Sequence, residues 1–410
     1  MLRLSELTEE YLGSLKYVDE IPREFSVRLK TSDILAIVGP RRVGKTFVML
    51  KACRELLNAS EQALYVPLDE PSLRNIGFRK LAELIRMEYP EGNVHLFLDE
   101  VQEWRDWDYG LRWLHDVKDF RLYVSGSSSA LLASEIPSRL RGRYVSRVLY
   151  PLSFREVVKF RVRTFRERGK VLALLEDYLK WGGFPEVWVS KSREKLVSLL
   201  ETIFYRDIIE RFRIRDIDVF KEVFYFVLSN YSNPFTYRGL RRLLKGLGVE
   251  VDVKTVISYL NCMKQALLIM TCELLTPSSR KRTVNPRKAY LIDHALANLF
   301  PRTLDKGRVI ENVVFVELKR RLGALSEVHY YRTRKGEEVD FVVTEAGRPK
   351  EVIEAAFTHD AEHLRKVSEA AGELGLKEAT LVTWDEEHQE RINGITVKVK
   401  PLWKWLLHRE

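Results

Sequence analysis

The feature that most constrains the fold of this chain is a short glycine-bearing segment near its start. Asp33–Val38 reads DILAIV, an apolar run of strand length, and Phe47–Ala59 reads FVMLKACRELLNA, which is compatible with a helix. Between them, Gly39–Thr46 (GPRRVGKT) matches the pattern G-x-x-x-x-G-K-[ST]. This strand–loop–helix order predicts a phosphate-binding loop on a parallel α/β sheet.

The residues of this loop suit a nucleoside triphosphate. Its glycines let backbone N–H groups curl around a β-phosphate, and the following helix directs its positive end to the same place. Lys45 is expected to reach the β- and γ-phosphates, and the Thr46 hydroxyl is expected to ligate Mg²⁺. We therefore expect ATP and Mg²⁺ to bind at this loop, whose residues are Gly39, Pro40, Arg41, Arg42, Val43, Gly44, Lys45 and Thr46.

A pair of acids further along the chain completes the predicted site. Val94–Glu100 reads VHLFLDE, an apolar run that ends in two carboxylates. Ligands of doubly wound sheets gather at the carboxyl ends of the strands, where Asp99 and Glu100 would lie. We expect Asp99 to help hold Mg²⁺ and Glu100 to polarise the attacking water. The alternative is that the acid pair only caps a following helix.

Two later segments supply further catalytic candidates. The stretch RLYV reads as a third strand and is followed by SGSSS, so the hydroxyl of Ser125 or Ser127 is expected to contact the γ-phosphate or the attacking water. Arginines crowd residues 138–157, and many ATPases neutralise the transferring phosphate with an arginine from a neighbouring subunit. Arg143 is the favoured finger and Arg141 is the reserve. A solvated or DNA-facing basic turn is the alternative.

The chain beyond this core predicts two more segments. Residues 159–217 read as a helical lid on a 1–158 core, with a stop-and-turn signal at Gly182–Gly183. Residues 218–304 read as a winged helix, because helices in helix–turn–helix order precede two strands that flank the basic loop SSRKRTVNPRK.

The winged-helix interpretation predicts contacts with DNA. The last helix would enter a groove with its polar side, while the basic loop would meet phosphate. The predicted DNA-binding residues are Lys254, Thr255, Ser258, Asn261 and Lys264 on the helix, and Arg280, Lys281 and Arg282 in the loop. The formal charge of +10 also fits a polyanion. The alternative is a module that binds an unknown protein partner and carries a solvated basic loop.

Several motifs together resemble those of a known family. GPRRVGKT, LDEVQEW, SGSSS, LRGRY followed by PLSFREV, and GGFPEV look like the motifs of archaeal and bacterial AAA-type P-loop ATPases with a fused C-terminal restriction-endonuclease-like domain. The resemblance covers nearly the whole chain, and it implies a core that forms homo-oligomers and DNA as a partner. The expected fold is α/β: a P-loop (AAA-type) parallel-sheet ATPase core, a helical lid, a winged helix, and a C-terminal α/β endonuclease-like domain at 305–410.

The order of elements in residues 305–410 resembles the PD-(D/E)XK nuclease fold. In that pattern Glu311 is the helix acid, and Asp340 and Glu354 are the two acids that hold a metal ion. The pattern then requires a lysine two residues after Glu354, but this chain has Ala356 at that position. We therefore expect a degenerate nucleic-acid-binding fold rather than an active nuclease.

Composition and residue spacing also bear on membrane association and on other metal sites. The hydrophobic and charged fractions, 45% and 31%, indicate a globular protein. The chain has no apolar run of about eighteen residues and no signal-peptide-like start, so we expect a cytoplasmic protein without membrane association. Three cysteines without a CxxC pair argue against a zinc knuckle. His359 and His363 would share a helix face, but spacing fixes no third ligand, which favours a hydrated helix start.

These patterns favour a Mg²⁺-dependent ATPase that binds or remodels DNA through its C-terminal half. Two alternatives remain open from the residues alone. One is an ATP-switched regulator whose winged helix binds a protein partner or an operator. The other is an ATP-gated DNA nuclease.

Overall fold

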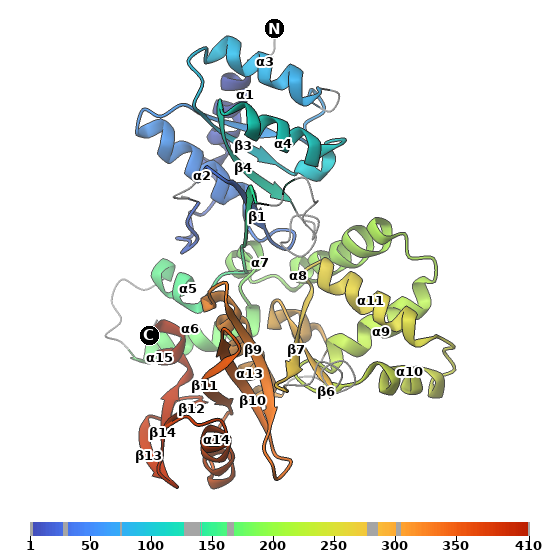
Figure 1. The fold of residues 1–410 in the computed structure, drawn as a ribbon, viewed down its shortest axis with the longest axis vertical. Helices are drawn as coiled ribbons and strands as arrows, with labels where there is room; N and C mark the ends of the chain where they lie inside the picture. The colour runs from blue at the N-terminus through green and yellow to red at the C-terminus, as the bar shows by residue number, and fades with distance from the viewer. Residues whose placement is uncertain are drawn as a thin grey trace. The chain divides into compact units, whose positions relative to one another are not determined.

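The computed structural model describes residues 3–27, 32–73, 76–126, 140, 142–161, 168–276, 286–300 and 305–408 (Figure 1). The chain divides into two compact units, Met1–Tyr150 and Pro151–Glu410. Among the described residues, no helix combines the length and the apolar character needed to cross a membrane.

The first unit is a parallel α/β sheet with helices. Its strand order is β2-β3-β4-β1-β5, and each neighbouring pair is parallel. The strands β1 to β3 are buried at every residue, as expected for parallel strands covered on both faces. The elements are α1 (Leu4–Ser14), η1 (Leu15–Tyr17), β1 (Ile34–Val38), α2 (Lys45–Asn58), β2 (Ala63–Pro67), α3 (Phe78–Glu88), β3 (Val94–Asp99), η2 (Val101–Glu103), α4 (Trp107–Val117), β4 (Phe120–Gly126) and β5 (Tyr144–Val148).

Two glycines fix the path of the loop between β1 and α2. A Cβ atom on Gly39 would lie 2.6 Å from the carbonyl oxygen of Leu149, so the close approach to the end of β5 requires glycine. Gly44 has a φ of +95° at the N-cap of α2, in the region where glycine is favoured. The predicted strand–loop–helix order is therefore present, with α2 starting at Lys45.

The second unit is built on one mixed sheet. Within the described residues, nine strands form this sheet in the order β13-β14-β12-β11-β10-β9-β7-β8-β6. The elements are α5 (Phe154–Arg161), α6 (Arg168–Trp181), α7 (Pro185–Ser190), α8 (Arg193–Thr202), the π-helix η5 (Ile203–Glu210), α9 (Ile217–Ser229), β6 (Pro234–Phe235), α10 (Tyr237–Gly246), α11 (Val253–Gln265), β7 (Ile269–Leu274), β8 (Arg287–Leu291), η6 (His294–Leu299), α13 (Lys306–Arg321), β9 (Ser326–Arg332), β10 (Glu338–Glu345), β11 (Arg348–Ala355), α14 (Ala361–Glu373), β12 (Glu378–Thr383), β13 (His388–Ile392), β14 (Ile395–Pro401) and α15 (Leu402–Leu407).

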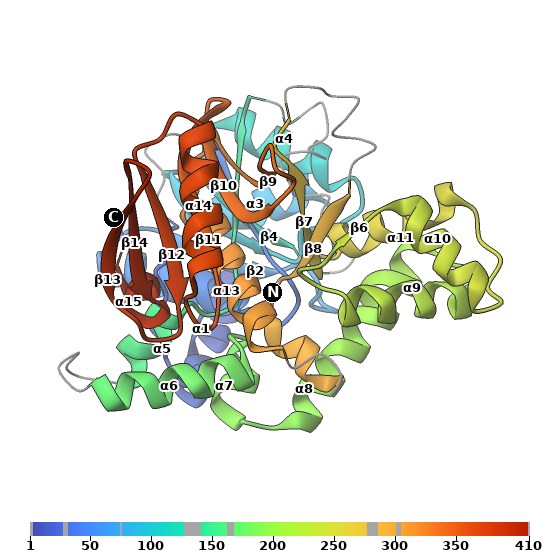
Figure 2. The ribbon, with the colours of Figure 1, turned by 90° about the horizontal axis from the view of Figure 1, so that it is seen from below.

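Two helices cover the C-terminal part of this sheet. Phe341 of β10 packs with Phe315 of α13, whose ring centroid lies 5.9 Å away. The neighbouring residue Val342 belongs instead to the apolar cluster that includes Leu364 of α14. Because successive strand residues point to opposite faces, α13 and α14 lie on opposite faces of the sheet (Figure 2).

One strand pairing joins two segments that the sequence predicts as separate domains. β7 pairs in parallel with β9, with Glu273 opposite His329 and Leu274 opposite Tyr330. The predicted winged-helix segment 218–304 and the predicted endonuclease-like segment 305–410 therefore share one sheet. Helices and strands occur in the order predicted for both segments, while the assignment of the winged-helix and endonuclease-like folds stays a prediction.

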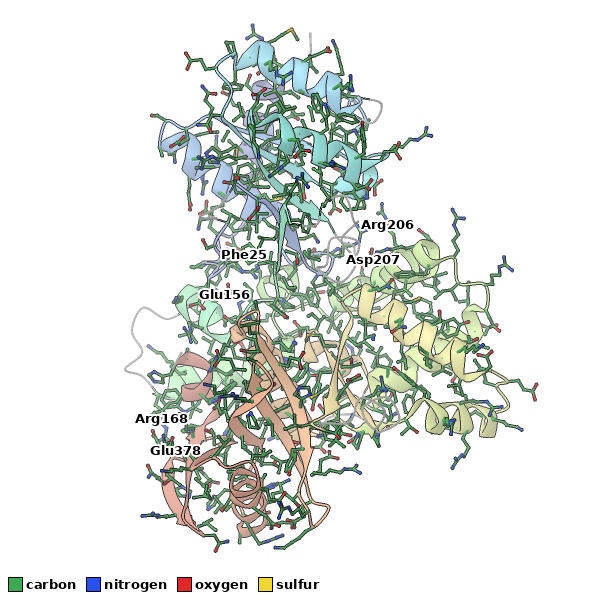
Figure 3. The ribbon with its side chains drawn as sticks, in the orientation of Figure 1. Phe25, Glu156, Arg168, Arg206, Asp207 and Glu378 are labelled. Carbon is green, nitrogen blue, oxygen red and sulfur yellow. The ribbon has the colours of Figure 1, made fainter. Side chains whose placement is uncertain are left out.

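The PLSFREV and GGFPEV motifs have structural roles in the second unit. Ser153 and Glu156 form a reciprocal capping box at the start of α5, since the Ser153 N–H donates to Glu156 (2.8 Å) and the Glu156 N–H donates to Ser153 (3.1 Å). Figure 3 labels Glu156 at this position. A Cβ atom on Gly183 would lie 2.3 Å from the carbonyl oxygen of Leu152, so glycine lets the two motifs pack together.

Candidate functional site

Lys45 folds back over the phosphate loop of the first unit. Its Nζ donates to the carbonyl oxygens of Gly39 (3.0 Å) and Pro40 (3.1 Å), and its side chain is buried. Thr46, the next residue, is exposed in the first turn of α2. The ammonium group therefore lies within the curl of the loop, which is the region where phosphate oxygens are expected.

Four donors converge on the carboxylate of Asp99. The hydroxyls of Thr46 (2.6 Å) and Tyr65 (2.5 Å) donate to Oδ2. The hydroxyl of Ser125 and the N–H of Glu100 (3.2 Å) donate to Oδ1. Asp99 itself is buried at 3% exposure, so its orientation is fixed by these contacts. Thr46 and Asp99, which are both predicted to ligate Mg²⁺, are thus hydrogen-bonded to each other in the structure.

Strand register explains why these side chains meet. Val38 pairs with Gly126, so the end of β1 lies beside the end of β4. Leu98 pairs with Val124, which brings Asp99 next to Ser125 on the neighbouring strand. The carboxyl ends of β1, β3 and β4 therefore form one edge, where ligands of parallel sheets gather.

Ser125 contacts both Asp99 and Glu100 in the structure. Its side chain is fully buried, its hydroxyl donates to Asp99, and its oxygen accepts the Glu100 N–H at 3.2 Å. The hydroxyl therefore orients Asp99, and its contact with a γ-phosphate or the attacking water stays a prediction. Ser127, the other predicted serine, lies outside the described residues.

Glu100 follows Asp99 in an uncommon backbone conformation. Its φ of +54° lies in the left-handed region, which a residue with a Cβ atom adopts only when the surroundings hold it there. Gln102 donates to the Glu100 carboxylate. This bend separates the Glu100 side chain from the buried Asp99, and the half-buried Glu100 remains available at the edge of the sheet.

Two residues of this site, Tyr65 and Asp69, belong to no sequence motif. Tyr65 of β2 is buried, and burial together with the Asp99 carboxylate raises its pKa, so it remains a donor at neutral pH. Asp69 follows the same strand, and burial together with the charges of Asp99 and Glu100 raises its pKa. The edge of the sheet thus gathers negative charge, which suits a bound cation.

Arg143 does not lie at this edge. Ile34 pairs with Tyr144, so Arg143 precedes the amino end of β5, about 13 Å of strand from the phosphate loop. Its Nε donates to Asp116 at 3.0 Å. Within one chain Arg143 is therefore remote from the loop, and a finger role requires a second subunit. Arg141, the reserve, lies outside the described residues.

The residues predicted to contact DNA differ in exposure. On α11, Lys254 and Ser258 are exposed, whereas Thr255 and Asn261 are half-buried. Lys264 is also half-buried, and burial together with Arg287 lowers its pKa, so its head group does not face open solvent. The basic loop residues Arg280, Lys281 and Arg282 lie outside the described residues.

A basic stripe on α10 is absent from the sequence prediction. It consists of Arg238, Arg241, Arg242 and Lys245, and all four are exposed. Their spacing of three, four and seven residues from the first puts them on one face of a helix. Residues 211–265 contain ten Lys and Arg and five Asp and Glu. This excess of five positive charges is half of the net charge of +10. A periodic count of basic residues would have found this stripe.

Two of the three predicted metal-binding acids of the second unit, Glu311 and Asp340, contact one buried lysine. Lys288 of β8 contacts Glu311 (2.9 Å), Asp340 (3.1 Å) and Glu338 (2.9 Å), and its side chain is 3% exposed. Burial alone would lower the pKa of Lys288, but these carboxylates raise it well above its ordinary value. Burial and the charge of Asp340 raise the pKa of Glu311, while the Lys288 ammonium lowers it.

The third acid of this cluster is also paired. Glu354 contacts Lys366 and His363 of α14, the latter at 3.3 Å, and accepts the Asp340 N–H at 3.2 Å. Lys366 thus brings a cation to Glu354 from a helix, although Ala356 stands where the nuclease pattern requires a lysine. Because the Lys288 ammonium already lies between Glu311 and Asp340, this arrangement does not fit a divalent metal ion held by those acids.

Comparisons with known proteins identify the family of the first unit. The AAA domain family matches residues 31–158, so the first unit contains an AAA-type P-loop ATPase domain. Two families described as domains of unknown function, DUF8612 and DUF4143, match residues 172–305 and 306–405. The uncharacterized protein MJ1544 of Methanocaldococcus jannaschii is 30% identical over 423 residues, which cover 98% of this chain and 94% of that protein.

More distant relatives and solved structures were also found. An uncharacterized protein of Haemophilus influenzae is 25% identical over 389 residues, covering 90% of this chain and 94% of that protein. The Walker-type ATPase PABY2304 of Pyrococcus abyssi is 16% identical with a TM-score of 0.46, covering 71% of this chain and 94% of that chain. AMPPCP-bound DnaA from Aquifex aeolicus is 14% identical with a TM-score of 0.31, covering 63% and 86%.

Proposed function

Since the chain belongs to the same family as the Methanocaldococcus jannaschii protein MJ1544 and contains an AAA-type ATPase domain, we propose that it is a Mg²⁺-dependent ATPase that binds DNA through its second unit. One observation carries the ATPase proposal: the Thr46 hydroxyl at the start of α2 lies 2.6 Å from the Asp99 carboxylate at the end of β3. The loop and the acid come from distant parts of the sequence, and together they supply oxygen ligands beside a lysine.

The residues present fit Mg²⁺. This ion takes oxygen ligands at 2.0–2.1 Å in octahedral geometry, which sets adjacent ligands about 2.9 Å apart. Thr46 and Asp99 would hold it after separating by a few tenths of an ångström. When bound with ATP beside Thr46 and Asp99, Mg²⁺ would supply positive charge that neutralises the charge developing on the transferring phosphate.

The side chains of the chain then divide the work of hydrolysis. Lys45 leaves the carbonyl oxygens that it now contacts and binds β- and γ-phosphate oxygens. Glu100 accepts a proton from the attacking water, and Gln102 orients its carboxylate. Ser125 and Tyr65 hold Asp99 in position without touching the nucleotide.

A second subunit completes the site in this proposal. Arg143 precedes the amino end of β5 and pairs with Asp116, so it serves a neighbouring chain and not its own phosphate loop. An arginine supplied in this way stabilises the charge of the transferring phosphate. The proposal therefore includes a homo-oligomer during turnover.

The DNA proposal rests on charge. The exposed stripe on α10 and the exposed Lys254 of α11 belong to the segment that contains half of the net positive charge. Lysine and arginine stripes of this kind neutralise phosphates of nucleic acid. Cleavage of DNA is not part of the proposal, because Lys288 already pairs with the acids that a nuclease would use to hold a metal ion.

The experiment that tests the ATPase proposal is a comparison of two glutamine variants. Glu100→Gln keeps the size of the side chain but removes the base, so it should bind ATP with normal affinity and hydrolyse it at least 100-fold more slowly, within the range of about 10²–10⁴ for general-base catalysis. Glu103→Gln changes an exposed acid three residues further on, and it should turn over at the wild-type rate. Normal turnover by Glu100→Gln would show that another residue activates the water.

A further inference from the structure

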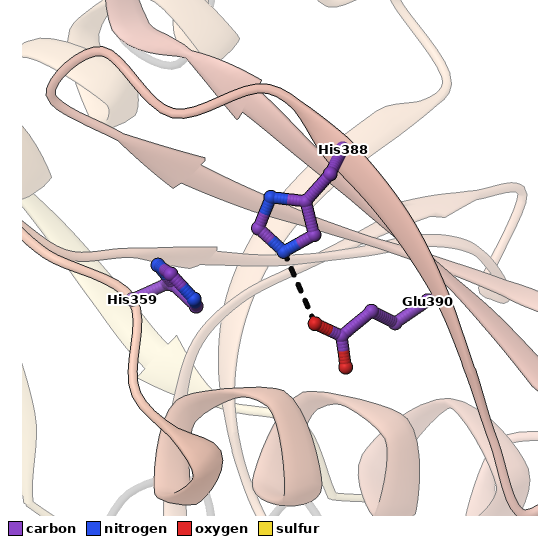
Figure 4. Close-up of side chains that lie close together, drawn as sticks. All are labelled: His359, His388 and Glu390. Carbon is purple, nitrogen blue, oxygen red and sulfur yellow. Dashed lines mark hydrogen bonds and ion pairs between the residues drawn. The ribbon is translucent and has the colours of Figure 1, made fainter.

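Three ligand-type side chains gather at the edge of the second unit, apart from both sites described above. They are His359, His388 and Glu390, and Figure 4 shows them pointing into one space. One ligand atom from each lies within 4.8 Å of the other two. The imidazole centroids of His359 and His388 are 4.9 Å apart, and His388 Nε2 lies 3.2 Å from Glu390 Oε1.

The backbone explains why these side chains meet. His388 and Glu390 alternate with Gln389 on β13, which is the edge strand beside β14, so both point to one face. His359 lies on the connection between β11 and α14. Its ring also contacts Glu386, which lies just before β13 and adds a second carboxylate to the group.

The connection that carries His359 is braced against the turn before β13. The Trp384 N–H donates to the Phe357 carbonyl at 3.1 Å, and the two rings stack with centroids 5.8 Å apart. The Glu386 N–H donates to the Thr383 hydroxyl at 3.1 Å. These contacts hold the two segments side by side, so the meeting of the histidines does not depend on flexible side chains alone.

The chemistry of the group selects one class of ion. Two imidazoles with one or two carboxylates suit Zn²⁺ and its borderline neighbours Co²⁺ and Ni²⁺, whereas Mg²⁺ and Ca²⁺ prefer oxygen ligands throughout. A tetrahedral Zn²⁺ ion with bonds of 2.0–2.1 Å needs ligand atoms about 3.4 Å apart. The ligand atoms now lie within 4.8 Å of one another, and small side-chain rotations would bring them to that spacing.

We propose that His359, His388 and Glu390 form a binding site for one zinc-class divalent ion. The site is open to solvent, since the side chains of His359, His388 and Glu390 are 37%, 33% and 43% exposed, so an ion can enter without unfolding. Glu386 or a water molecule supplies the fourth ligand.

An ion at this site would fasten α14 to the edge of the sheet. His359 lies two residues before α14, whose first turns carry His363 and Lys366. Those two residues contact Glu354 in the buried acid cluster. A bound ion would therefore connect β13 to the start of α14, and α14 in turn contacts Glu354. We expect this connection to raise the melting temperature.

The test is a titration of the full-length chain, freed of metal and nucleotide, with Zn²⁺ by calorimetry and with Co²⁺ by visible absorption. The wild type should bind one Zn²⁺ per chain and give the d–d absorption of Co²⁺ bound to imidazole nitrogen. His359→Ala and His388→Ala should each weaken Zn²⁺ binding at least tenfold and abolish the Co²⁺ spectrum. His408→Ala, which removes an exposed histidine that is not one of the three ligands, should bind like the wild type.

The folded state of each variant is checked by circular dichroism and melting. Zn²⁺ should raise the melting temperature of the wild type and of His408→Ala, but not that of His359→Ala or His388→Ala. Absence of stoichiometric Zn²⁺ binding by the wild type would overturn the proposal. Equal binding by the wild type and both His→Ala variants would overturn it as well, since the ion would then lie elsewhere.

Discussion

The Tyr65 hydroxyl lies 2.5 Å from the Oδ2 atom of Asp99. Tyr65 belongs to β2 and Asp99 to β3, and the same oxygen also accepts the hydroxyl of Thr46. A residue without any motif thus orients the acid that is proposed to hold Mg²⁺. Contacts of this kind set the direction of a metal-binding carboxylate and commonly affect metal affinity by about 10–100-fold.

Removal of the Tyr65 hydroxyl should therefore weaken the use of Mg²⁺. Tyr65→Phe keeps the buried ring, so the fold should persist while Asp99 loses one donor. We expect the Mg²⁺ concentration for half-maximal ATP hydrolysis to rise about tenfold, with little change in the rate at saturating Mg²⁺. Steady-state hydrolysis across a Mg²⁺ series measures both quantities.

The matched control for this variant is Tyr11→Phe. The Tyr11 hydroxyl also donates to a carboxylate, that of Glu70 at 3.0 Å, but Glu70 is no part of the Asp99 network. Tyr11→Phe should leave the Mg²⁺ dependence unchanged. If both variants shifted the Mg²⁺ dependence equally, general destabilisation of the first unit would explain the result. The role proposed for Tyr65 would then be wrong.

Lys288 should be required for stability of the second unit. Lys288→Met leaves three carboxylates without their shared cation in a buried place, and loss of one partner from a buried ion pair costs about 3–5 kcal/mol. Lys398→Met provides the control, because it breaks an exposed pair with Glu378 in the same sheet. That change should cost about 1 kcal/mol or less. Urea unfolding measures both, and equal losses would contradict the buried pairing.

The α10 stripe should govern binding to DNA. Arg238→Glu with Arg242→Glu reverses two exposed charges on one helix face and should weaken duplex binding at least tenfold. The slope of log affinity against log salt should also become shallower by about one for each phosphate that the variant no longer neutralises. Fluorescence anisotropy across a salt series records both effects.

A second double variant separates the stripe from net charge. Arg348→Glu with Lys377→Glu changes the charge by the same amount at exposed positions in the C-terminal part of the sheet. It should retain most of the affinity and the original salt slope. Wild-type protein that binds DNA weakly and without salt dependence would favour the alternative of a regulator acting on a protein partner.

Short motifs allowed most of the first site to be predicted. The loop, Thr46, Asp99 and Glu100 are separated in sequence, but strand–loop–helix order and the rule for carboxyl ends of parallel strands bring them together. The role of Tyr65 could not be predicted, because sequence alone does not distinguish a tyrosine on a buried strand from an ordinary core residue. Its role depends on which strand lies beside β3, and no local pattern encodes that neighbour.

Non-local pairing also explains what was missed in the second unit. Lys288 reaches Glu311 and Asp340 because β8 and β10 belong to one sheet through the parallel pairing of β7 with β9. The sequence pattern predicts a domain boundary between these strands, so it does not indicate that Lys288 reaches acids of the following segment. Helical spacing would put His359 and His363 on one face, but α14 begins only at Ala361. His363 contacts Glu354, while His359 lies near His388.

The most direct test of the central claim is calorimetry with ATP in the presence and absence of Mg²⁺. The wild type should bind one ATP per chain with Mg²⁺ and more weakly without it. Lys45→Ala, which removes the ammonium group within the loop, should reduce affinity at least tenfold while the protein remains folded. Absence of heat from folded wild-type protein at saturating Mg²⁺, or equal affinity in Lys45→Ala, would contradict the claim that this loop and Asp99 form the nucleotide site.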